Sequence, residues 1–386
     1  MAAGGAPAPL GQNNSVIYRN ADREYYVEGC GLVRTDNGTL VAVVPVIPRD
    51  EWTETRRVDH CTTHILVSTD GGGKWRELSN LPYYSCVPWT RGDELYVFAM
   101  KGGAKARNDD LLLLRSTDGG ANWSTPVTLF RGHYWNCHTG MVLRDQKLYW
   151  AVDDLSLGGK RGPVAVIGDL SGDPLQARAW RLSNPVPFPG MPEQMISRPL
   201  RGLGSRYLEP NVIDVYGQLR ILATVKAARQ SSAGVCAVLD LEDDGREARL
   251  TFNQFSSMPG GQLKFCVIWD AVSKLFWATA NLVADSQGAM PWWGQAAKQT
   301  KFRGDGGLGG NDRRFLMLFY SLDALNWFQA GCVAQAAKVS QSFMYARPVI
   351  DGDDLAIISR SSIEAPNQHD ADHATAAATE FLEISH

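Results

Sequence analysis

Short apolar runs separated by turns recur along the chain, and several share one form: an apolar strand, a turn, a leucine and a second apolar strand. Runs of this kind, bounded by turn residues, predict β-strands. The intervals between the shared leucines are 55, 53, 71, 56 and 80 residues, close to or above the roughly 40–50 residues of a four-stranded repeat unit. The leucines are Leu40, Leu95, Leu148, Leu219, Leu275 (after a longer turn) and Leu355.

Two turns that follow such runs match one pattern, S-x-D-x-G-x-x-W, at residues 68–75 and 116–123. Serine and aspartate oxygens accept hydrogen bonds from turn amides, glycine supplies a positive φ, and the tryptophan folds back as an apolar plug. The two copies lie 48 residues apart, which indicates a structural repeat. A third copy, at residues 321–327, is one residue shorter and lacks the glycine.

Together the two repeats predict an all-β protein, a β-propeller with six blades, with seven as the alternative. The last blade uses residues 373–384 and is completed by an N-terminal strand near residues 15–18, which leaves no sheet edge open. We expect residues 1–14 to form a flexible tail and residues 15–386 to form one domain.

Composition narrows the function classes. A net charge of −3 gives no electrostatic footprint for nucleic acid or for an anionic membrane. No apolar run reaches the roughly 18–20 residues that span a bilayer, and the first ten residues do not resemble a signal peptide. The seven cysteines include no C-x-x-C, which favours buried free thiols and a reducing compartment.

We expect neither a metal nor a cofactor. Two histidine pairs with i, i+4 spacing, His60 with His64 and His369 with His373, lack a third ligand at a typical metal-site spacing. The segments 183–206 and 287–313 are long insertions rich in glycine and proline, which we expect to be functional loops. The second carries Trp292, which either stacks on a sugar ring or plugs its own loop.

In a propeller the first strand of each blade lines the central channel, so residues at equal distances before the shared leucines meet at one end. Positions 10 and 12 before each leucine face the same way, because side chains alternate along a strand. Acid, base and cation occur together in this set, which favours a site over a solvated or salt-bridged channel. The members are Glu28, Cys30, Tyr83, Ser85, Asn136, His138, Tyr207, Glu209, Phe343 and Tyr345, with Arg347 one step deeper. Gln262 and Lys264 join them if one residue is allowed for the longer turn before Leu275.

These features resemble the sialidase superfamily of glycan-active β-propellers, over about residues 26–383. The S-x-D-x-G-x-x-W turns are similar to its Asp-boxes, also called BNR repeats. The stretch RRVDH is similar to the loop of the acid/base aspartate and matches it with Asp59. LEPNVI and SFMYAR are similar to the strands of the glutamate that activates the nucleophile and of the nucleophilic tyrosine, and match them with Glu209 and Tyr345.

The chain departs from true sialidases at two of the arginines that hold the sugar carboxylate. Glu28 stands in place of the first, and the stretch ATVK at residues 223–226 stands in place of the second. A glutamate at that position repels a carboxylate. The resemblance therefore implies a carbohydrate-active enzyme whose substrate is not sialic acid.

Three functions remain open. The first is an exo-acting glycoside hydrolase, with Glu209 and Tyr345 on the nucleophile side, Asp59 or Glu28 as acid/base, and His138 orienting the glycan. The second is a polysaccharide lyase that uses His138 or Tyr345 as base in β-elimination from a uronic acid, and the third is a non-catalytic glycan-binding propeller. Substrate contacts are expected from Lys264, Arg347, Tyr207, Asn136, Arg198, His60, Tyr83, Gln262 and Trp292.

Overall fold

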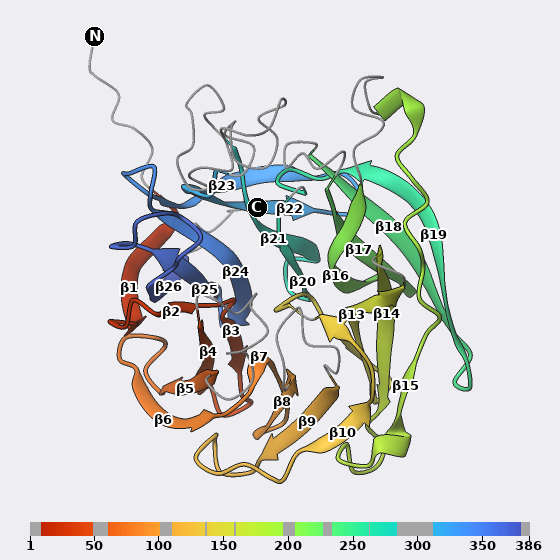
Figure 1. The fold of residues 1–386 in the computed structure, drawn as a ribbon, viewed down its shortest axis with the longest axis horizontal. Helices are drawn as coiled ribbons and strands as arrows, with labels where there is room; N and C mark the ends of the chain where they lie inside the picture. The colour runs from red at the N-terminus through yellow and green to blue at the C-terminus, as the bar shows by residue number, and fades with distance from the viewer. Residues whose placement is uncertain are drawn as a thin grey trace.

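The strands form six antiparallel sheets arranged around a common axis, so the protein is a six-bladed β-propeller (Figure 1). The computed structural model describes residues 9–48, 61–100, 110–135, 137–157, 160–195, 205–226, 234–261, 263–283 and 312–379. Within these ranges no helix is long and apolar enough to cross a membrane.

In blades 1 to 5 the strands run from the axis outward in chain order, and in blade 6 the N-terminal strand is outermost. Blade 1 contains β2 (Tyr25–Val27), β3 (Gly31–Arg34), β4 (Leu40–Pro48), β5 (Thr62–Ser68) and β6 (Arg76–Leu81), with β2 and β3 both paired to β4. Blade 2 contains β7 (Tyr84–Arg91), β8 (Glu94–Met100), β9 (Leu111–Ser116) and β10 (Val127–Phe130). Blade 3 contains β11 (Tyr134–Trp135), β12 (Val142–Arg144), β13 (Lys147–Leu157), β14 (Lys160–Asp169) and β15 (Trp180–Leu182).

The second half of the ring repeats this order. Blade 4 contains β16 (Arg206–Val215), β17 (Gln218–Lys226), β18 (Val235–Asp243) and β19 (Ala248–Ser257). Blade 5 contains β20 (Cys266–Asp270), β21 (Leu275–Asn281), β22 (Phe315–Ser321) and β23 (Phe328–Gln335). Blade 6 contains β24 (Ser342–Asp351), β25 (Asp354–Ser362), β26 (His373–Thr379) and β1 (Gly11–Arg19). Two short 3₁₀ helices, Ala177–Ala179 and Glu193–Met195, flank β15 of blade 3.

The ring is closed by the N-terminal strand, as the sequence predicts. β1 pairs antiparallel with β26, with Val16 opposite Thr375 and Tyr18 opposite Ala374. It begins at Gly11, four residues before the strand expected near Ser15. The seam to blade 1 is bridged by a hydrogen bond of 3.0 Å between Tyr18 Oη and His64 Nε2. β1 is therefore the outermost strand of the last blade, and it joins the start of the chain to its end.

The S-x-D-x-G-x-x-W turns join the third and fourth strands of blades 1 and 2, at the outer rim. In the first, the Gly72 amide donates to Ser68 Oγ at 2.9 Å and Trp75 Nε1 donates to the Gly72 carbonyl at 2.9 Å. Residues 116–123 repeat both bonds. In the shorter third turn, Ala324 adopts the positive φ (58°) that glycine supplies elsewhere. These turns therefore stabilise the rim, away from the channel.

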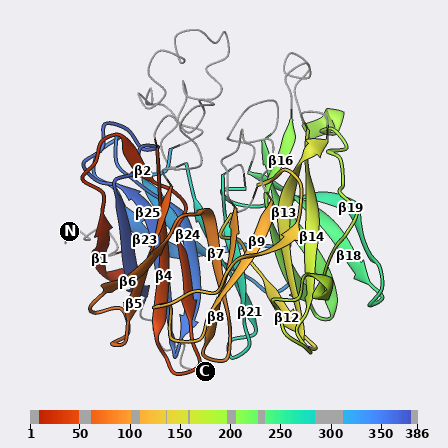
Figure 2. The same ribbon diagram turned by 60° about the horizontal axis from the view of Figure 1, so that its bottom comes forward.

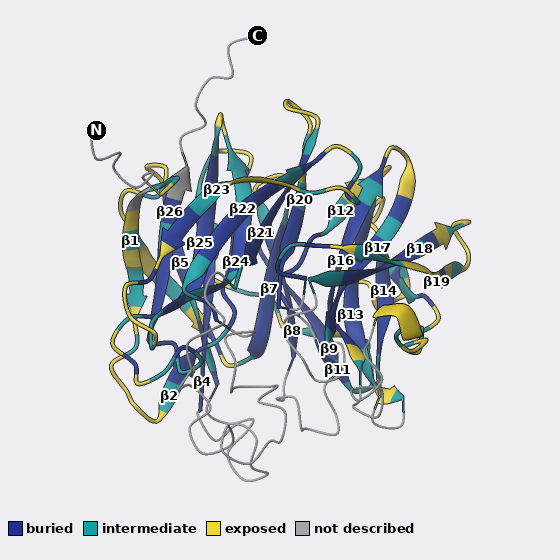
Figure 3. Cartoon of the chain, turned by 90° about the horizontal axis from the view of Figure 1, so that it is seen from above, coloured by how far each residue is buried: buried dark blue, intermediate teal, exposed yellow. Residues whose placement is uncertain are grey.

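The hydrophobic cores lie between neighbouring blades, where the strand faces are buried (Figure 3). Phe98 of blade 2 stacks on Trp150 of blade 3 with ring centroids 4.5 Å apart, and both side chains are fully buried. Six of the seven cysteines are buried as free thiols, and Cys332 is half-buried. Blade-to-blade packing of large side chains thus holds each sheet at its angle to the next.

Removing residues 1–19 should destabilise the whole ring, because β26 would lose its partner and expose an unpaired edge. We expect a melting temperature lower by several degrees and concentration-dependent aggregation, measured by calorimetry and size-exclusion chromatography. Removing only residues 1–8, which leaves β1 in place, is the control. Equal melting temperatures for the two truncations would contradict this account of closure.

Candidate functional site

The first strands of blades 2, 4 and 6 are each interrupted by a β-bulge at the same level. The registers of β7, β16 and β24 shift after Tyr84, Leu208 and Met344. In each strand the next residue has a positive φ, and it is the tenth residue before the shared leucine. These residues are Ser85 (46°), Glu209 (51°) and Tyr345 (54°).

A positive φ costs a residue other than glycine about 1 kcal/mol or more. Three such residues at one level of the channel are held by the surrounding sheets, and bulges of this kind commonly re-aim side chains beside active sites. The bulge also breaks the period-two alternation of the strand. Position 12 consequently no longer faces the same way as position 10.

This break corrects the expectation that both positions face the mouth. Tyr207 is fully buried between blades 3 and 4, with its ring 4.7 Å from Phe188. Tyr83 packs against the core between blades 1 and 2, and Phe343 packs against the core of blades 5 and 6. All three were expected at the mouth and pack in or against the cores between blades instead; two of them, Tyr207 and Tyr83, were predicted as substrate contacts.

Glu209 and Tyr345 meet across the channel. Tyr345 Oη donates a hydrogen bond of 3.0 Å to Glu209 Oε1. Burial raises the pKa of the Glu209 carboxyl above its ordinary value, against the opposing charge of Arg313. Burial and the neighbouring Glu209 carboxylate raise the pKa of the Tyr345 phenol well above its ordinary value. This hydrogen bond therefore joins a buried carboxyl group to a phenol, and a proton can pass between them along it.

Two arginines lie against the ring of Tyr345. The Cζ atoms of Arg313 and Arg360 are 5.1 and 5.4 Å from the ring centroid, within range of a cation–π interaction. Arg360 Nη1 is also 3.5 Å from Glu28 Oε2. Both arginines were missed because neither is on a first strand: one precedes β22 and the other is in β25. A lone arginine in the apolar run of β25 was the available signal.

Asp153 supports Glu209 from the second strand of blade 3. Its Oδ2 accepts the Glu209 main-chain amide at 3.2 Å and lies 3.2 Å from Arg161 Nη1. Its side chain is fully buried, and burial raises the pKa of its carboxyl. Asp153 thus holds the backbone of Glu209 in its left-handed conformation.

A small cavity lies beside this pair, between blades 1, 2, 3 and 6. Its lining includes Glu28, Gly29, Ser85, His138 and Tyr345. Burial, followed by the charges of Lys264 and Arg347, lowers the pKa of His138 well below its ordinary value. Its imidazole is therefore neutral at pH 7, and its Nδ1 has no hydrogen-bond partner among the described residues.

Gly31 leaves room for the His138 ring beside blade 1, because a Cβ at Gly31 would lie 2.5 Å from His138 Nδ1. At Gly29 a Cβ would be a close contact, 3.3 Å from His138 Cδ2 and 3.5 Å from Tyr345 Cδ1. The sequence placed Glu28, His138, Glu209 and Tyr345 at one mouth, and the structure brings these four residues to the same region of the channel.

Lys264 and Arg347 lie deeper and serve the main chain. Lys264 Nζ donates to the Ala346 carbonyl at 2.7 Å. Arg347 donates to the carbonyls of Leu32 at 3.1 Å and Thr139 at 2.6 Å. These bonds connect blades 5, 6, 1 and 3 around the axis, so both cations have the positions of structural residues and not of the substrate contacts expected from the sequence.

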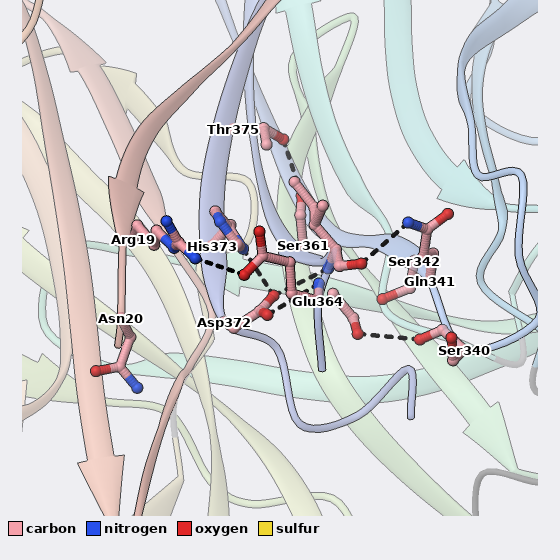
Figure 4. Close-up of polar contacts among 12 residues, drawn as sticks. Arg19, Asn20, Ser340, Gln341, Ser342, Ser361, Glu364, Asp372, His373 and Thr375 are labelled. Atoms are coloured by element: carbon pink, nitrogen blue, oxygen red, sulfur yellow. Dashed lines mark hydrogen bonds and ion pairs between the residues drawn. The ribbon is translucent and has the colours of Figure 1, made fainter. Parts of the chain in front are cut away.

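The connection between β25 and β26 is held close to the site. The Asp372 carboxylate accepts the amides of Ile363 and Glu364, both at 2.9 Å, and lies 2.7 Å from His373 Nδ1. Figure 4 shows this group together with Arg19, which pairs with Glu364 at 2.6 Å. Arg360 also donates to a main-chain carbonyl of this connection, that of His369. The connection therefore contacts both Arg360 of the site and Arg19 of the ring-closing strand β1.

Six predicted site residues lie outside the described residues: Asp59, His60, Asn136, Arg198, Gln262 and Trp292.

No group of three or more histidine, cysteine, aspartate or glutamate side chains suited to a metal occurs within the described ranges.

No family model matches the chain, and no curated protein matches it. Solved structures do. A Dyadobacter fermentans protein of unknown function is 14% identical, with a TM-score of 0.61 over 96% of this chain and 99% of that one. A mutant of Trypanosoma rangeli sialidase displaying trans-sialidase activity is 13% identical, with a TM-score of 0.61 over 96% of this chain.

The fold is that of a sialidase-like propeller. The chain spans 59% of the length of the trypanosomal protein. An α-L-arabinofuranosidase of Fusarium graminearum, solved with arabinobiose, is 12% identical, with a TM-score of 0.57 over 96% of this chain and 98% of that one. At these identities the sialidase-like propellers share architecture, and the chemistry has to be derived from the site itself.

Asp153→Ala should lower the free energy of unfolding by about 3 kcal/mol, because it leaves Arg161 and the Glu209 amide without their buried partner. Urea unfolding measures the change. Asp154→Ala is the matched control: its Oδ1 accepts only from Ser156 among the described residues, and we expect a loss below about 1 kcal/mol. Equal losses in the two variants would exclude a supporting role for Asp153.

Glu209→Gln should raise the melting temperature at neutral pH. The folded protein raises the pKa of this carboxyl, so ionisation above the raised pKa destabilises the folded state, while an amide carries no such cost. The advantage should disappear as the pH falls through the ordinary glutamate pKa, where the carboxyl is protonated in both states. Calorimetry at several pH values tests this, and a lower melting temperature for the variant throughout would contradict it.

Proposed function

We propose that the protein is an exo-acting glycoside hydrolase with a substrate other than sialic acid. The observation that carries the proposal is the 3.0 Å hydrogen bond from Tyr345 to Glu209 at the channel mouth. A phenol is a weak nucleophile until a base takes its proton, and a carboxylate with a raised pKa is a better proton acceptor. A small cavity lined by Glu28 and His138 lies beside the pair.

The proposed reaction has two steps. Tyr345 Oη forms a bond to the anomeric carbon as the glycosidic bond breaks, Glu209 takes the phenol proton, and an acid gives a proton to the leaving oxygen. Asp59 is the proposed acid, with Glu28 as the alternative. Water then attacks the anomeric carbon as its bond to Tyr345 Oη breaks. The water gives a proton to the group that acted as acid, and Glu209 returns its proton to Tyr345 Oη. Tyrosine replaces the usual carboxylate nucleophile in this scheme.

Charge at the site supports a neutral sugar. Glu28 lines the cavity itself, and a glutamate there repels the carboxylate of an acidic sugar. The charges of Lys264 and Arg347 also act on the cavity, but both side chains donate to main-chain carbonyls.

The solved relatives suggest where to begin. The Fusarium graminearum protein is named an α-L-arabinofuranosidase and was solved with arabinobiose, a neutral disaccharide. Arabinofuranosides are therefore the first neutral substrates to test on this chain.

A polysaccharide lyase is the second candidate, and one observation favours it. His138 lines the same cavity and is neutral at pH 7, so it could take the C5 proton of a uronic acid as a general base. Elimination leaves an unsaturated uronide that absorbs ultraviolet light, whereas hydrolysis leaves a new reducing end without absorbance.

Purified protein should be screened against aryl glycosides, including arabinofuranosides, and uronate oligosaccharides, with reducing ends and absorbance followed together. Glu209→Gln and Tyr345→Phe should each lower kcat by roughly 10²–10⁴-fold. Tyr320→Phe, which removes a hydroxyl far from the mouth on β22, is the matched control and should retain full turnover. Thermal unfolding of each variant checks that the ring is intact.

Three results would reject the hydrolase. Full turnover in both site variants removes Glu209 and Tyr345 from the mechanism. Absorbance that is lost in His138→Ala identifies the lyase. Glycan binding that persists in Glu209→Gln, with no turnover by the unsubstituted protein on any substrate, identifies a non-catalytic glycan-binding propeller.

A further inference from the structure

A second hollow lies at the opposite end of the channel, between the ends of the first strands of blades 3, 4 and 5. Its volume is about 450 Å³, within the range of about 300–1,000 Å³ that is usual for ligand sites. In Figure 2, β12 lies at the bottom of the view and β2, which leads to Glu28, lies at the top. Six residues of β16, 210–215, separate Glu209 from Tyr216, which is roughly 20 Å of extended strand.

Two aromatic side chains form part of the wall of this hollow. Tyr216 is 70% exposed and Trp269 is 39% exposed, and their rings meet edge to face at 6.1 Å. Trp269 is backed by Phe276 at 4.6 Å, and Tyr216 Oη donates to the Leu322 carbonyl at 2.6 Å. The rings are therefore held in place while parts of them face solvent.

An ion pair adds hydrogen-bonding groups to the same wall. Arg144 Nη1 donates to Asp214 Oδ2 at 2.8 Å and to the Gly217 carbonyl at 3.1 Å. The two side chains are about a third and a quarter exposed. A guanidinium offers several donors and a carboxylate several acceptors, so the pair can bind neighbouring hydroxyl groups without a net charge.

The backbone at Tyr216 is costly for its residue type. A two-residue turn, Tyr216 and Gly217, joins β16 to β17, and both residues have positive φ, 53° and 93°. Asparagine or glycine is favoured at the first position of such a turn. A tyrosine there is strained, and the strain is offset in part by the bond of its hydroxyl to Leu322.

We propose that this hollow is a second carbohydrate-binding site, which binds an internal segment of a neutral polysaccharide. Flat aromatic faces pack against the C–H faces of sugar rings, and the ion pair binds the hydroxyl groups at their edges. The choice of ligand rests on the proposed function. This second site would hold an internal segment of the polysaccharide while an end of the same polysaccharide reaches the Glu209–Tyr345 pair of this or another molecule.

Affinity electrophoresis through gels that contain arabinan, xylan or β-glucan tests the site. Each variant is made in the Glu209→Gln background, so that no polymer is degraded during the run. For at least one polysaccharide that retards the protein, Trp269→Ala and Tyr216→Asn should each lower the affinity about five- to tenfold. Asparagine suits the turn, so Tyr216→Asn removes the ring without endangering the fold.

Phe328→Ala is the matched control, because Phe328 is an aromatic residue on β23 of similar exposure (49%) outside the hollow. It should leave retardation unchanged. In the otherwise unsubstituted enzyme, Trp269→Ala should leave turnover of a short aryl glycoside unchanged, because that substrate does not reach the far end.

The outcomes separate this inference from the proposed function. If aryl glycosides are turned over and Trp269→Ala does not change retardation, the second site is rejected and the hydrolase stands. If no glycoside is turned over but retardation depends on Trp269 and Tyr216, the second site stands alone. Absence of retardation by all three gels rejects the site, as does a dimer seen by sedimentation that Tyr216→Asn dissociates, since a second copy of the chain would then occupy the hollow.

Discussion

The pairing of β1 with β26 is the constraint on which the rest of the molecule depends. Six twisted sheets converge on one axis only when the first and last are joined, and this joint is made by main-chain hydrogen bonds between residues more than 350 positions apart. The contacts of the site cross between blades: Tyr345 reaches Glu209 from blade 6 to blade 4, and Arg360 reaches Glu28 from blade 6 to blade 1. Precise closure of the ring therefore sets the geometry of the channel.

Within this rigid ring, three first strands carry strain at one level. The left-handed residues Ser85, Glu209 and Tyr345 would be unfavourable in an isolated strand, and they persist because the sheets on both sides fix their ends. Asp153 adds a hydrogen bond at Glu209, and buried charges accumulate around it. Much of the packing between blades is thus used to maintain a local arrangement that is unfavourable by itself, which is typical of functional sites.

Periodicity along the chain predicted the blade number, the closing strand and the convergence of Glu28, His138, Glu209 and Tyr345. Each of these follows from the spacing of apolar residues, which one sequence displays directly. It did not predict the bulges, so Tyr207 and Tyr83 were expected at the mouth and lie between blades instead. Asp153, Arg313 and Arg360 were missed because they reach the channel from second strands and connections, and such contacts depend on how neighbouring sheets are oriented.

The buried cysteines can report the separation of neighbouring blades, because their thiols react only when they become exposed. Burial raises the pKa of the Cys86 and Cys236 thiols to about 12, so almost none of either is present as the reactive thiolate at neutral pH. Cys86 lies in the core between blades 1 and 2, and Cys236 in the core between blades 4 and 5. Chemical labelling of each thiol therefore reports the separation of a different pair of blades, and the order of labelling gives the order in which the seams of the ring come apart.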